Sequence, residues 1–330
     1  MNTSYQKFIK EFGENKVLNN VNLAQFSSFK IGGPADLLFK AQNTDELINA
    51  VNLAGKLKIN YFIIGGGTNL LISDSGFRGL VIKNDSQQIK IVGLKGGNNK
   101  TDKSLKMKSV YLQADSGVGT NRLVRFSLDQ GFSGLEAFLG QPGSVGGALY
   151  INAHNMNMRK FIGDCVFSVK LLDSDGNLKD VDNNYMKFGY DLSILQKTKE
   201  TVISCIFKLN SGEKEALWKI GQLASDYRRD SQPVGYYSSG CTFRNISQSD
   251  AVRLATPNYT RSVGYLLDAV GLRGKKIGNV MFSEKHANFI VHRGEVKALD
   301  VIKLINLAKD LVKKKFNIDL HEEIVLLGIK

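Results

Sequence analysis

The stretch Ile63-Ile-Gly-Gly-Gly-Thr-Asn69 places three glycines directly after a short apolar run. A dinucleotide-binding Rossmann unit needs a Gly-x-Gly-x-x-Gly turn that opens a helix, because the helix N-terminus faces the pyrophosphate. Here the residues after Asn69 turn again at Gly76, which predicts a strand and a loop instead of a helix. Backbone N–H groups of the segment can still bind an anion, and ordinary tight turns are the alternative.

A second glycine-rich segment, Gly140-Gln-Pro-Gly-Ser-Val-Gly-Gly-Ala148, is followed by Asn152. The chain has 33 glycines against 4 prolines. Glycine lacks Cβ and allows positive φ, so clustered glycines indicate a backbone that approaches something closely. Two such segments favour one extended cofactor that carries phosphate.

The length of 330 residues predicts about two domains, and 42% hydrophobic residues can fill their cores. We expect a cytoplasmic protein without membrane insertion, because no apolar run reaches the roughly 18 residues that span a bilayer and the polar start is unlike a signal peptide. The three cysteines, Cys165, Cys205 and Cys241, are far apart. Their spacing argues against a disulfide framework and against a structural metal site.

The net charge of +13 would suit nucleic acid, an anionic surface or anionic small molecules. Much of the excess lies in a polar, glycine-rich stretch and on a late helix, at Lys90, Lys95, Lys100, Lys103, Lys106, Lys108 and 313–315. Few aromatic residues lie between these lysines, whereas nucleic-acid surfaces place stacking rings beside the basic groups. We therefore predict a solvated basic stretch and no nucleic-acid partner.

Apolar runs and turn residues predict an α+β chain. The predicted strands are 35–40, 61–64, 79–82, 89–92, 110–114, 166–172, 178–181, 202–209, 287–292 and 320–327, and the predicted helices are 46–56, 121–129, 214–227, 262–270 and 298–316. The pattern changes near Ser211. We expect the last strand to carry an acid back toward the first region.

Several long motifs, spread in order over nearly the whole chain, resemble the UDP-N-acetylenolpyruvoylglucosamine reductase family. They are Ser28-Phe-Lys-Ile-Gly-Gly-Pro-Ala35, Ile64-Gly-Gly-Gly-Thr-Asn-Leu-Leu71 with Gly76-Phe-Arg-Gly79, Gly134-Leu-Glu-Ala-Phe-Leu-Gly-Gln-Pro-Gly-Ser-Val-Gly-Gly147, Gln232-Pro233 and Ser283-Glu-Lys-His-Ala-Asn-Phe289.

The resemblance implies non-covalent FAD in a two-subdomain region of the vanillyl-alcohol-oxidase (PCMH) type, followed by an α+β substrate-binding domain. The expected divisions are 1–84, 85–211 and 212–330, with a C-terminal strand that returns to the active site. NADPH would reduce the flavin, which then reduces the enolpyruvyl group of UDP-N-acetylglucosamine enolpyruvate at C3 while an acid protonates C2. The product, UDP-N-acetylmuramate, serves peptidoglycan synthesis and thereby cell wall biogenesis, cell shape and cell division.

The resemblance also implies binding residues. Those for FAD are Gly65, Gly66, Gly67, Thr68, Asn69, Leu70, Gln141, Pro142, Gly143, Ser144, Gly146, Gly147 and Asn152. Those for the substrate are Tyr190, Arg244, Asn245 and His286, although His286 could equally be a structural histidine.

Two residues resemble the family's acids. Cys241, in Ser238-Ser-Gly-Cys-Thr-Phe-Arg-Asn245, stands where the family usually keeps a serine as proton donor. An ordinary thiol, with a pKa near about 8.5, is protonated at pH 7 and can act as a general acid. Glu323 matches the glutamate that assists protonation. The alternatives are a small core cysteine and a solvent-facing acid.

Two residues depart from the family pattern. Asp191 stands where the family has an arginine that meets the substrate carboxylate, and His154 stands where it has glycine. Either Arg159, Arg228 or Arg244 replaces the missing cation, or Asp191 points away, or catalysis is weak. A flavin oxidoreductase of another kind, with His154 as a covalent flavin link, and a weakened FAD-binding homologue are therefore the alternative functions.

Overall fold

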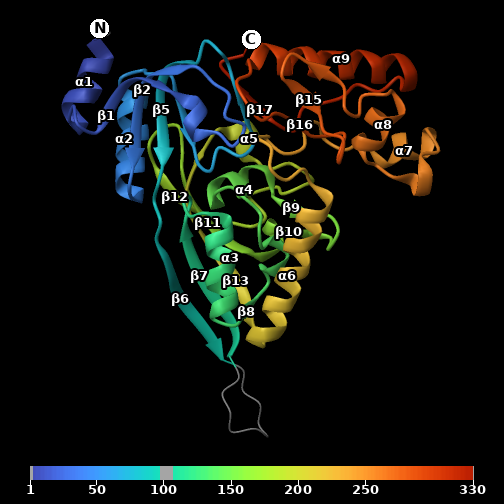
Figure 1. Cartoon of the computed structure of the whole chain (residues 1–330). Coiled ribbons are helices and arrows are strands. Elements are labelled where there is room, and N and C mark those ends of the chain that lie inside the picture. Colours follow the sequence, from blue (N-terminus) through green and yellow to red (C-terminus); the bar gives the residue numbers. More distant parts are fainter. Residues whose placement is uncertain (1–2, 97–106, 330) are drawn as a thin grey trace, which may run out of the picture. The chain divides into compact units, whose positions relative to one another are not determined.

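The computed structural model describes residues 3–96 and 107–329 (Figure 1). The chain divides into two compact units. The first unit consists of Met1–Leu18, Leu37–Gly66 and Gly79–Arg228, and the second of Asn19–Asp36, Gly67–Arg78 and Arg229–Lys330. The predicted division into 1–84, 85–211 and 212–330 has other boundaries, because each unit is built from several separate segments, and it stays a prediction.

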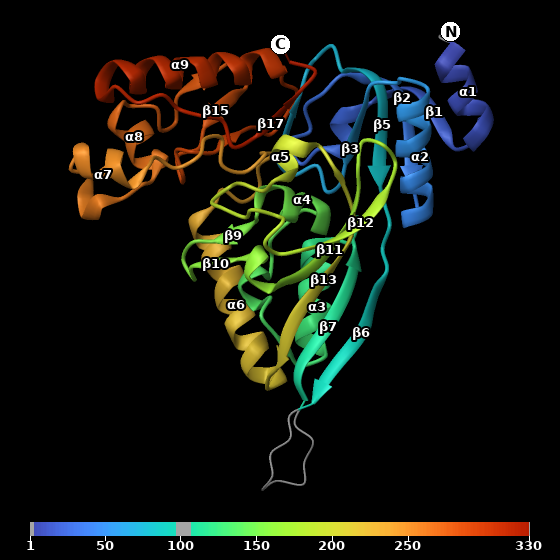
Figure 2. The same cartoon turned by 180° about the vertical axis from the view of Figure 1, so that it is seen from behind.

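The main sheet of the first unit is antiparallel and has the strand order β12-β11-β13-β7-β6 (Figure 2). Strand β8 pairs with one end of β13. Its strands are β6 (Ile89–Gly96), β7 (Met107–Asp115), β8 (Phe132–Ser133), β11 (Val166–Leu172), β12 (Leu178–Asp182) and β13 (Thr201–Ser211). On β7, Val110, Leu112 and Ala114 alternate with less buried residues, as expected of a strand with one face in the core.

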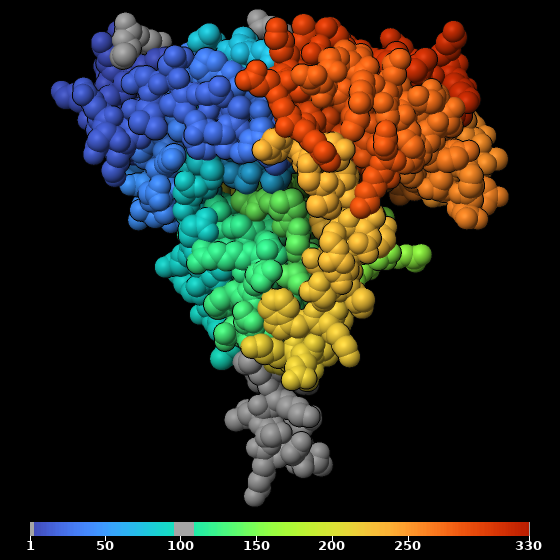
Figure 3. Space-filling model, in the orientation of Figure 1, coloured from blue at the N-terminus to red at the C-terminus, as the bar shows by residue number. Residues whose placement is uncertain are grey.

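Helices α3 (Thr120–Asp129), α4 (Val145–Ile151) and α6 (Lys214–Ser231) add to the same core. Gly221 of α6 lies so close to Leu128 and Leu139 that a Cβ there would be 3.1 Å from each side chain. The outer face of α6 lies on the surface in Figure 3, and Leu223 on this helix is 64% exposed.

A smaller sheet has the order β1-β2-β5-β3, from β1 (Val17–Asn22), β2 (Pro34–Ala41), β3 (Tyr61–Ile64) and β5 (Phe77–Asn84). Strands β3 and β5 run parallel. Helices α1 (Thr3–Phe12) and α2 (Thr44–Lys56) pack against this sheet and bury Phe8 and Leu47 in a common core. Asn43 caps α2, because its Oδ1 accepts a hydrogen bond from the Glu46 N–H at 2.9 Å.

The second unit joins the end of the chain to its first third. Strand β17 (Val325–Leu327) runs parallel to β4 (Leu70–Ile72), with Leu326 opposite Leu71. The unit also holds the antiparallel strands β14 (Lys276–Ile277), β15 (Val280–Phe282) and β16 (Ile290–Val291), and the helices α7 (Gln248–Arg253), α8 (Val263–Ala269) and α9 (Ala298–Phe316).

Helix α9 buries Val301, Leu304, Ile305, Ala308 and Val312, the spacing of one helix face. Short elements complete the description: α5 (Leu195–Thr198), β9 (His154–Asn155), β10 (Lys160–Phe161) and the 3₁₀ helices η1 (Leu23–Phe26), η2 (Glu136–Phe138), η3 (Ile162–Cys165) and η4 (Pro257–Tyr259).

Most predicted elements are confirmed, including the strand at 61–64 and the helix at 298–316, and a strand follows Asn69 where a Rossmann unit would have a helix. The strands predicted at 287–292 and 320–327 were too long, because only 290–291 and 325–327 pair as strands. Helices α1, α4, α5 and α7 were missed. In α4, Gly146 and Gly147 weaken the helical pattern, while Ser144 caps the helix through the Gly147 N–H at 3.4 Å.

Lys100, Lys103 and Lys106 of the basic stretch lie outside the described residues. Among the helices that the structure describes, none is long and apolar enough to cross a membrane.

Candidate functional site

The two glycine-rich segments meet in the first unit. Gly65 and Gly66 follow β3, and Gly143 and Ser144 precede α4. A Cβ on Gly65 would lie 2.0 Å from Ser144 Oγ, and one on Gly66 would lie 2.6 Å from Gly143 Cα. Side chains at these two positions would therefore push the segments apart, which explains the glycines physically.

The second segment is fixed by its own neighbours. Gly143 O accepts from the Thr120 N–H at 3.0 Å, and the Gly146 N–H donates to Ser116 O at 2.8 Å. Beside them, Gln141 Oε1 is buried and has no hydrogen-bond partner among the described residues. The unused acceptor fits a ligand that offers hydrogen-bond donors, such as the hydroxyl or ring N–H groups of FAD, whereas a plain turn leaves it unexplained. Gly147 is exposed, as is Pro142.

The rest of the first glycine segment belongs to the second unit. Gly67 has a φ of +64°, and a Cβ there would lie 1.9 Å from Phe26 O. Thr68 follows it, and then Asn69, whose Nδ2 donates to Glu323 O at 3.1 Å while its O accepts from the Val325 N–H at 2.9 Å. Leu70 begins β4 and is buried. Asn69 thus connects this segment to the last strand.

Cys241 and Glu323, 82 positions apart, come from neighbouring backbone segments of the second unit. The Glu323 N–H donates to Thr242 O at 2.9 Å, and Arg244 N–H donates to His321 O at 2.9 Å. On its other side, Cys241 forms a bridge with Phe289. Both Cys241 and Glu323 are half-buried. The structure therefore brings the two predicted acids onto adjacent segments, which the sequence could place only by resemblance.

Asn288 holds this arrangement and was not singled out from the sequence. Its side chain is 2% exposed, accepts from the Phe243 N–H at 3.0 Å and donates to Phe243 O at 2.8 Å. Its own O accepts from Thr242 N–H at 2.7 Å. The signal was present, because Asn288 lies within the motif at 283–289.

The predicted substrate residues Arg244, Asn245 and His286 also lie in the second unit. Asn245 Oδ1 accepts from the Val263 N–H at 3.2 Å at the start of α8. His286 Nδ1 accepts from the Asn288 N–H at 3.3 Å, and burial, aided by the charge of Arg273, lowers the pKa of His286. His286 is therefore a neutral ring with one nitrogen used by the fold.

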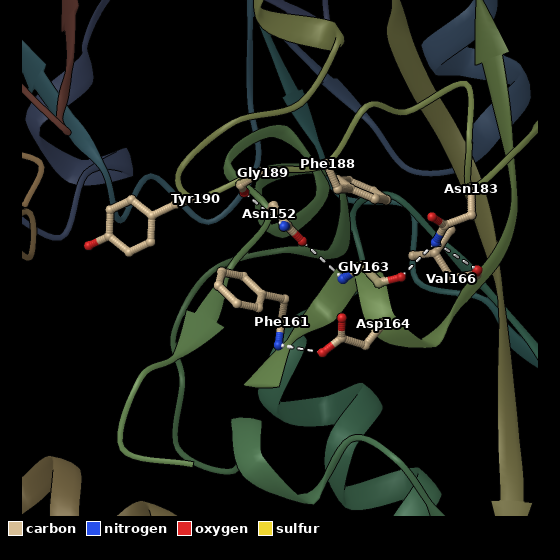
Figure 4. Close-up of a pocket in the computed structure, with 9 residues that line it drawn as sticks. All are labelled: Asn152, Phe161, Gly163, Asp164, Val166, Asn183, Phe188, Gly189 and Tyr190. Carbon is tan, nitrogen blue, oxygen red and sulfur yellow. Dashed lines mark hydrogen bonds between the residues drawn. The ribbon is translucent and has the colours of Figure 1, made fainter. Parts of the chain in front are cut away.

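Asn152 and Tyr190 line a pocket of about 650 Å³ in the first unit (Figure 4). Asn152 is 3% exposed, donates from Nδ2 to Gly189 O at 2.9 Å and accepts at Oδ1 from the Gly163 N–H at 3.0 Å. Figure 4 shows its amide spanning these two walls. Asn152 thus fixes the segment that carries Tyr190, besides any contact with a cofactor.

The departures at positions 154 and 191 lie side by side. Asp191 is 1% exposed, and its Oδ1 lies 3.4 Å from His154 Nδ1. Burial and then the charge of Arg228 lower the pKa of His154 to about 4. Among the candidate replacement cations, Arg228 acts electrostatically on His154, whereas Arg159 is exposed at a turn.

Of the other two cysteines, Cys205 lies in the core of the first unit and Cys165 is half-buried against it. Burial raises the pKa of Cys165 to about 11 and also raises the pKa of Cys205. The residues that the structure describes contain no group of three histidines, cysteines or acids that could hold a metal ion.

The chain is similar in sequence to known proteins. A family model described as UDP-N-acetylenolpyruvoylglucosamine reductase, C-terminal domain, matches residues 232–327, and an FAD binding domain model matches 35–182. UDP-N-acetylenolpyruvoylglucosamine reductase of Clostridium botulinum (strain 657 / Type Ba4) is 34% identical over 328 residues, 98% of either chain. That of Halalkalibacterium halodurans is 35% identical over 320 residues, 96% of either chain.

The chain is also similar to a solved structure of the same kind of enzyme. The crystal structure of UDP-N-acetylenolpyruvylglucosamine reductase from Thermus caldophilus has a TM-score of 0.72 and 27% identity, and the match covers 94% of this chain and 98% of that one.

Proposed function

The chain belongs to the UDP-N-acetylenolpyruvoylglucosamine reductase family, and from this premise we propose how its own residues carry out the reaction. It is an FAD-dependent oxidoreductase with NADPH as reductant, on the α+β fold expected. It reduces the enolpyruvyl group of UDP-N-acetylglucosamine enolpyruvate to give UDP-N-acetylmuramate, a peptidoglycan precursor. The comparisons give no support to another flavin oxidoreductase or to a weakened homologue.

Bound FAD supplies the ring that carries hydride from NADPH to the substrate. We assign its binding to the two glycine-rich segments: Gly65, Gly66, Gly67, Thr68, Asn69 and Leu70 in one, and Gln141, Pro142, Gly143, Ser144, Gly146 and Gly147 in the other. The contact of Gly65 and Gly66 with Gly143 and Ser144 supports this assignment, because a close backbone junction offers N–H groups without side chains in the way. Asn152 supports the site by fixing the segment at 188–193.

The observation that carries the catalytic assignment is the hydrogen bond from Glu323 N–H to Thr242 O, which joins the segments of the two acids. Cys241 is the proton donor: its S–H bond breaks as a C–H bond forms at C2 of the enolpyruvyl group, and a thiolate remains. Glu323 assists from the adjacent segment. The neighbouring Arg244, Asn245 and His286, together with Tyr190, bind the sugar nucleotide.

The test is a two-step anaerobic experiment. Protein loaded with FAD is bleached by one equivalent of NADPH and then mixed with UDP-N-acetylglucosamine enolpyruvate. We expect the yellow colour to return without oxygen, and the product to gain two hydrogens. Bleaching without return of colour would refute the substrate assignment.

We also propose that the enzyme acts in the cytoplasm, where its nucleotide substrates are made. Fractionation of cells that carry the tagged chain would place it with soluble cytoplasmic markers, and recovery with the membrane pellet would contradict this.

A further inference from the structure

The segment at 188–193 holds a buried acid in an uncommon backbone conformation. Asp191 has a φ of +50°, in the left-handed region that residues with a Cβ seldom adopt. Its carboxyl group is 1% exposed. Both features cost free energy unless the surroundings hold the residue in place.

Hydrogen bonds to the end of α4 hold the segment on both sides of Asp191. Asn152 Nδ2 donates to Gly189 O at 2.9 Å, and Ser193 Oγ donates to Tyr150 O at 2.7 Å. Gln196 Nε2 donates to Asp191 O at 2.8 Å and to Tyr150 O at 3.1 Å. The backbone conformation at Asp191 is therefore fixed by contacts with the end of α4, the helix that begins within the second glycine-rich segment.

His154 contacts both residues at the tip of this segment. Its Nδ1 lies 3.4 Å from Asp191 Oδ1, and its ring centroid lies 4.8 Å from that of Tyr190, at an interplanar angle of 38°. Phe161, opposite His154 in the β9–β10 pair, lies 5.6 Å away, centroid to centroid. The His154 side chain is only 16% exposed. The imidazole therefore packs as part of the support beneath Tyr190.

The ionisable side chains to consider here are Asp191, His154 and Arg228. The low pKa of His154, about 4, keeps the imidazole neutral at pH 7, and Arg228 is close enough for its charge to contribute to that shift. A buried carboxylate requires a nearby cation or polar contacts. The His154 ring lies against this carboxyl group, with Nδ1 3.4 Å from Asp191 Oδ1.

We propose that His154 and Asp191 form a pair that fixes the ring of Tyr190 for substrate binding. His154 is then a positioning residue, and the acid at position 191 acts through Tyr190. The inference rests on the proposed function, because the contact of Tyr190 with the substrate is part of that function.

Three variants separate the contacts. His154→Phe keeps an aromatic ring against Tyr190 but offers no polar atom to Asp191. Asp191→Asn keeps the shape and removes the charge, and the double variant combines both. Met156→Ala, at an exposed position in the same loop, is the matched control.

We expect His154→Phe to raise the KM for the enolpyruvyl sugar about tenfold, with kcat changed less than about threefold, because Tyr190 contributes to binding before and during the reaction. The double variant should recover most of this loss, because no buried charge then lacks its partner. A wild-type KM in His154→Phe, or no recovery in the double variant, would overturn the proposal. A general loss of structure would lower kcat as well, without recovery.

A second readout is independent of activity. The chain has four histidines, so ring ¹⁵N signals can be assigned by comparison with His154→Asn. Asp191→Asn should shift the His154 signals more than those of the other three histidines. Equal shifts would exclude the pair even in active enzyme, whereas wild-type protein that never reduces the enolpyruvyl sugar would refute the proposed function and leave the pair measurable.

Discussion

The three cysteines show how surroundings separate residues of one type. Cys205 is 1% exposed in β13, and Cys165 packs against the same core from η3. Both have raised pKa values, so both stay inert thiols at neutral pH. Cys241 is half-buried in the second unit, next to the segment of Glu323. Of the three cysteines, Cys241 is therefore the one whose surroundings suit a catalytic role.

Cys241→Ala should slow reoxidation by the enolpyruvyl sugar by about 10² to 10⁴, the usual contribution of a general acid. Bleaching by NADPH should change little, because that step needs no proton at C2. Cys241→Ser should retain more activity than the alanine variant. Stopped-flow absorbance separates the two steps, with Cys165→Ala as the control, and equal slowing of both steps would indicate a structural role for Cys241.

His154 should make folding stability depend on pH. Its pKa is about 4 in the folded chain against 6.5 as the ordinary value, so between these values the unfolded chain binds more protons. The free energy of unfolding therefore falls as the pH decreases through this window. Replacing His154 by Asn should remove about 2 kcal/mol of the loss between pH 7 and pH 5. Urea unfolding at both values measures it, and identical losses in the two proteins would contradict the burial of the imidazole.

At the scale of elements, glycines decide how close two loops can come. Gly66 meets the backbone of Gly143, whereas Gly55 in α2 has nothing within 4 Å of the place where its Cβ would lie. The two positions lie in the same unit, Gly66 in the bend after β3 and Gly55 within a helix. They form a matched pair for substitution.

Gly66→Ala should weaken FAD binding about tenfold or more, because its methyl group separates the two segments. Gly55→Ala should leave FAD affinity unchanged and stabilise the helix by up to about 1 kcal/mol. Fluorescence titration of apoprotein with FAD measures both affinities. Equal affinities in the two variants would argue against the assignment of these segments to the cofactor.

His292, directly after β16, forms a hydrogen bond with the backbone of Phe29. The His292 ring is 3% exposed, with Nε2 2.6 Å from Phe29 O and Nδ1 2.8 Å from Gly294 O. Its backbone pairs with Tyr237 in both directions. Ser28 Oγ adds a hydrogen bond to Ser238 O at 2.7 Å. The motif at 28–35 thus fixes the loop that leads to Cys241.

At the scale of the whole molecule, bound FAD should stabilise the chain against unfolding. Ligand that binds only the folded chain raises its stability by mass action. FAD at a hundredfold excess over its Kd should add about 2.7 kcal/mol and raise Tm by several degrees. Differential scanning fluorimetry measures this shift.

The same sample tests the mode of attachment. After acid denaturation the yellow colour should appear in the supernatant, because His154 lies packed between neighbours and no covalent link is expected. Colour that stays with the precipitated chain, or an unchanged Tm, would contradict non-covalent FAD.

The sequence by itself determined most of the elements and the family. Apolar alternation located β7, helical spacing located α9, and the residues after Asn69 excluded a Rossmann helix, because periodicity reports which face is buried. Long motifs carried the family, and with it FAD, NADPH and the two acids. Local pattern failed at α4, where a serine cap and packing outweigh two glycines, and at β16 and β17, where pairing covers only part of each apolar run.

Only the tertiary structure decided which distant segments meet. Parallel pairing of β17 with β4 places Glu323 beside Asn69, and the Asn288 amide fixes the segment of Cys241. The meeting of His154 with Asp191 turned two separate departures into one buried pair. The physical reason is that contact between residues far apart in the chain depends on strand order, loop closure and burial together. The pattern of residue types along the sequence reflects only local preferences, and these do not specify which distant segments pair.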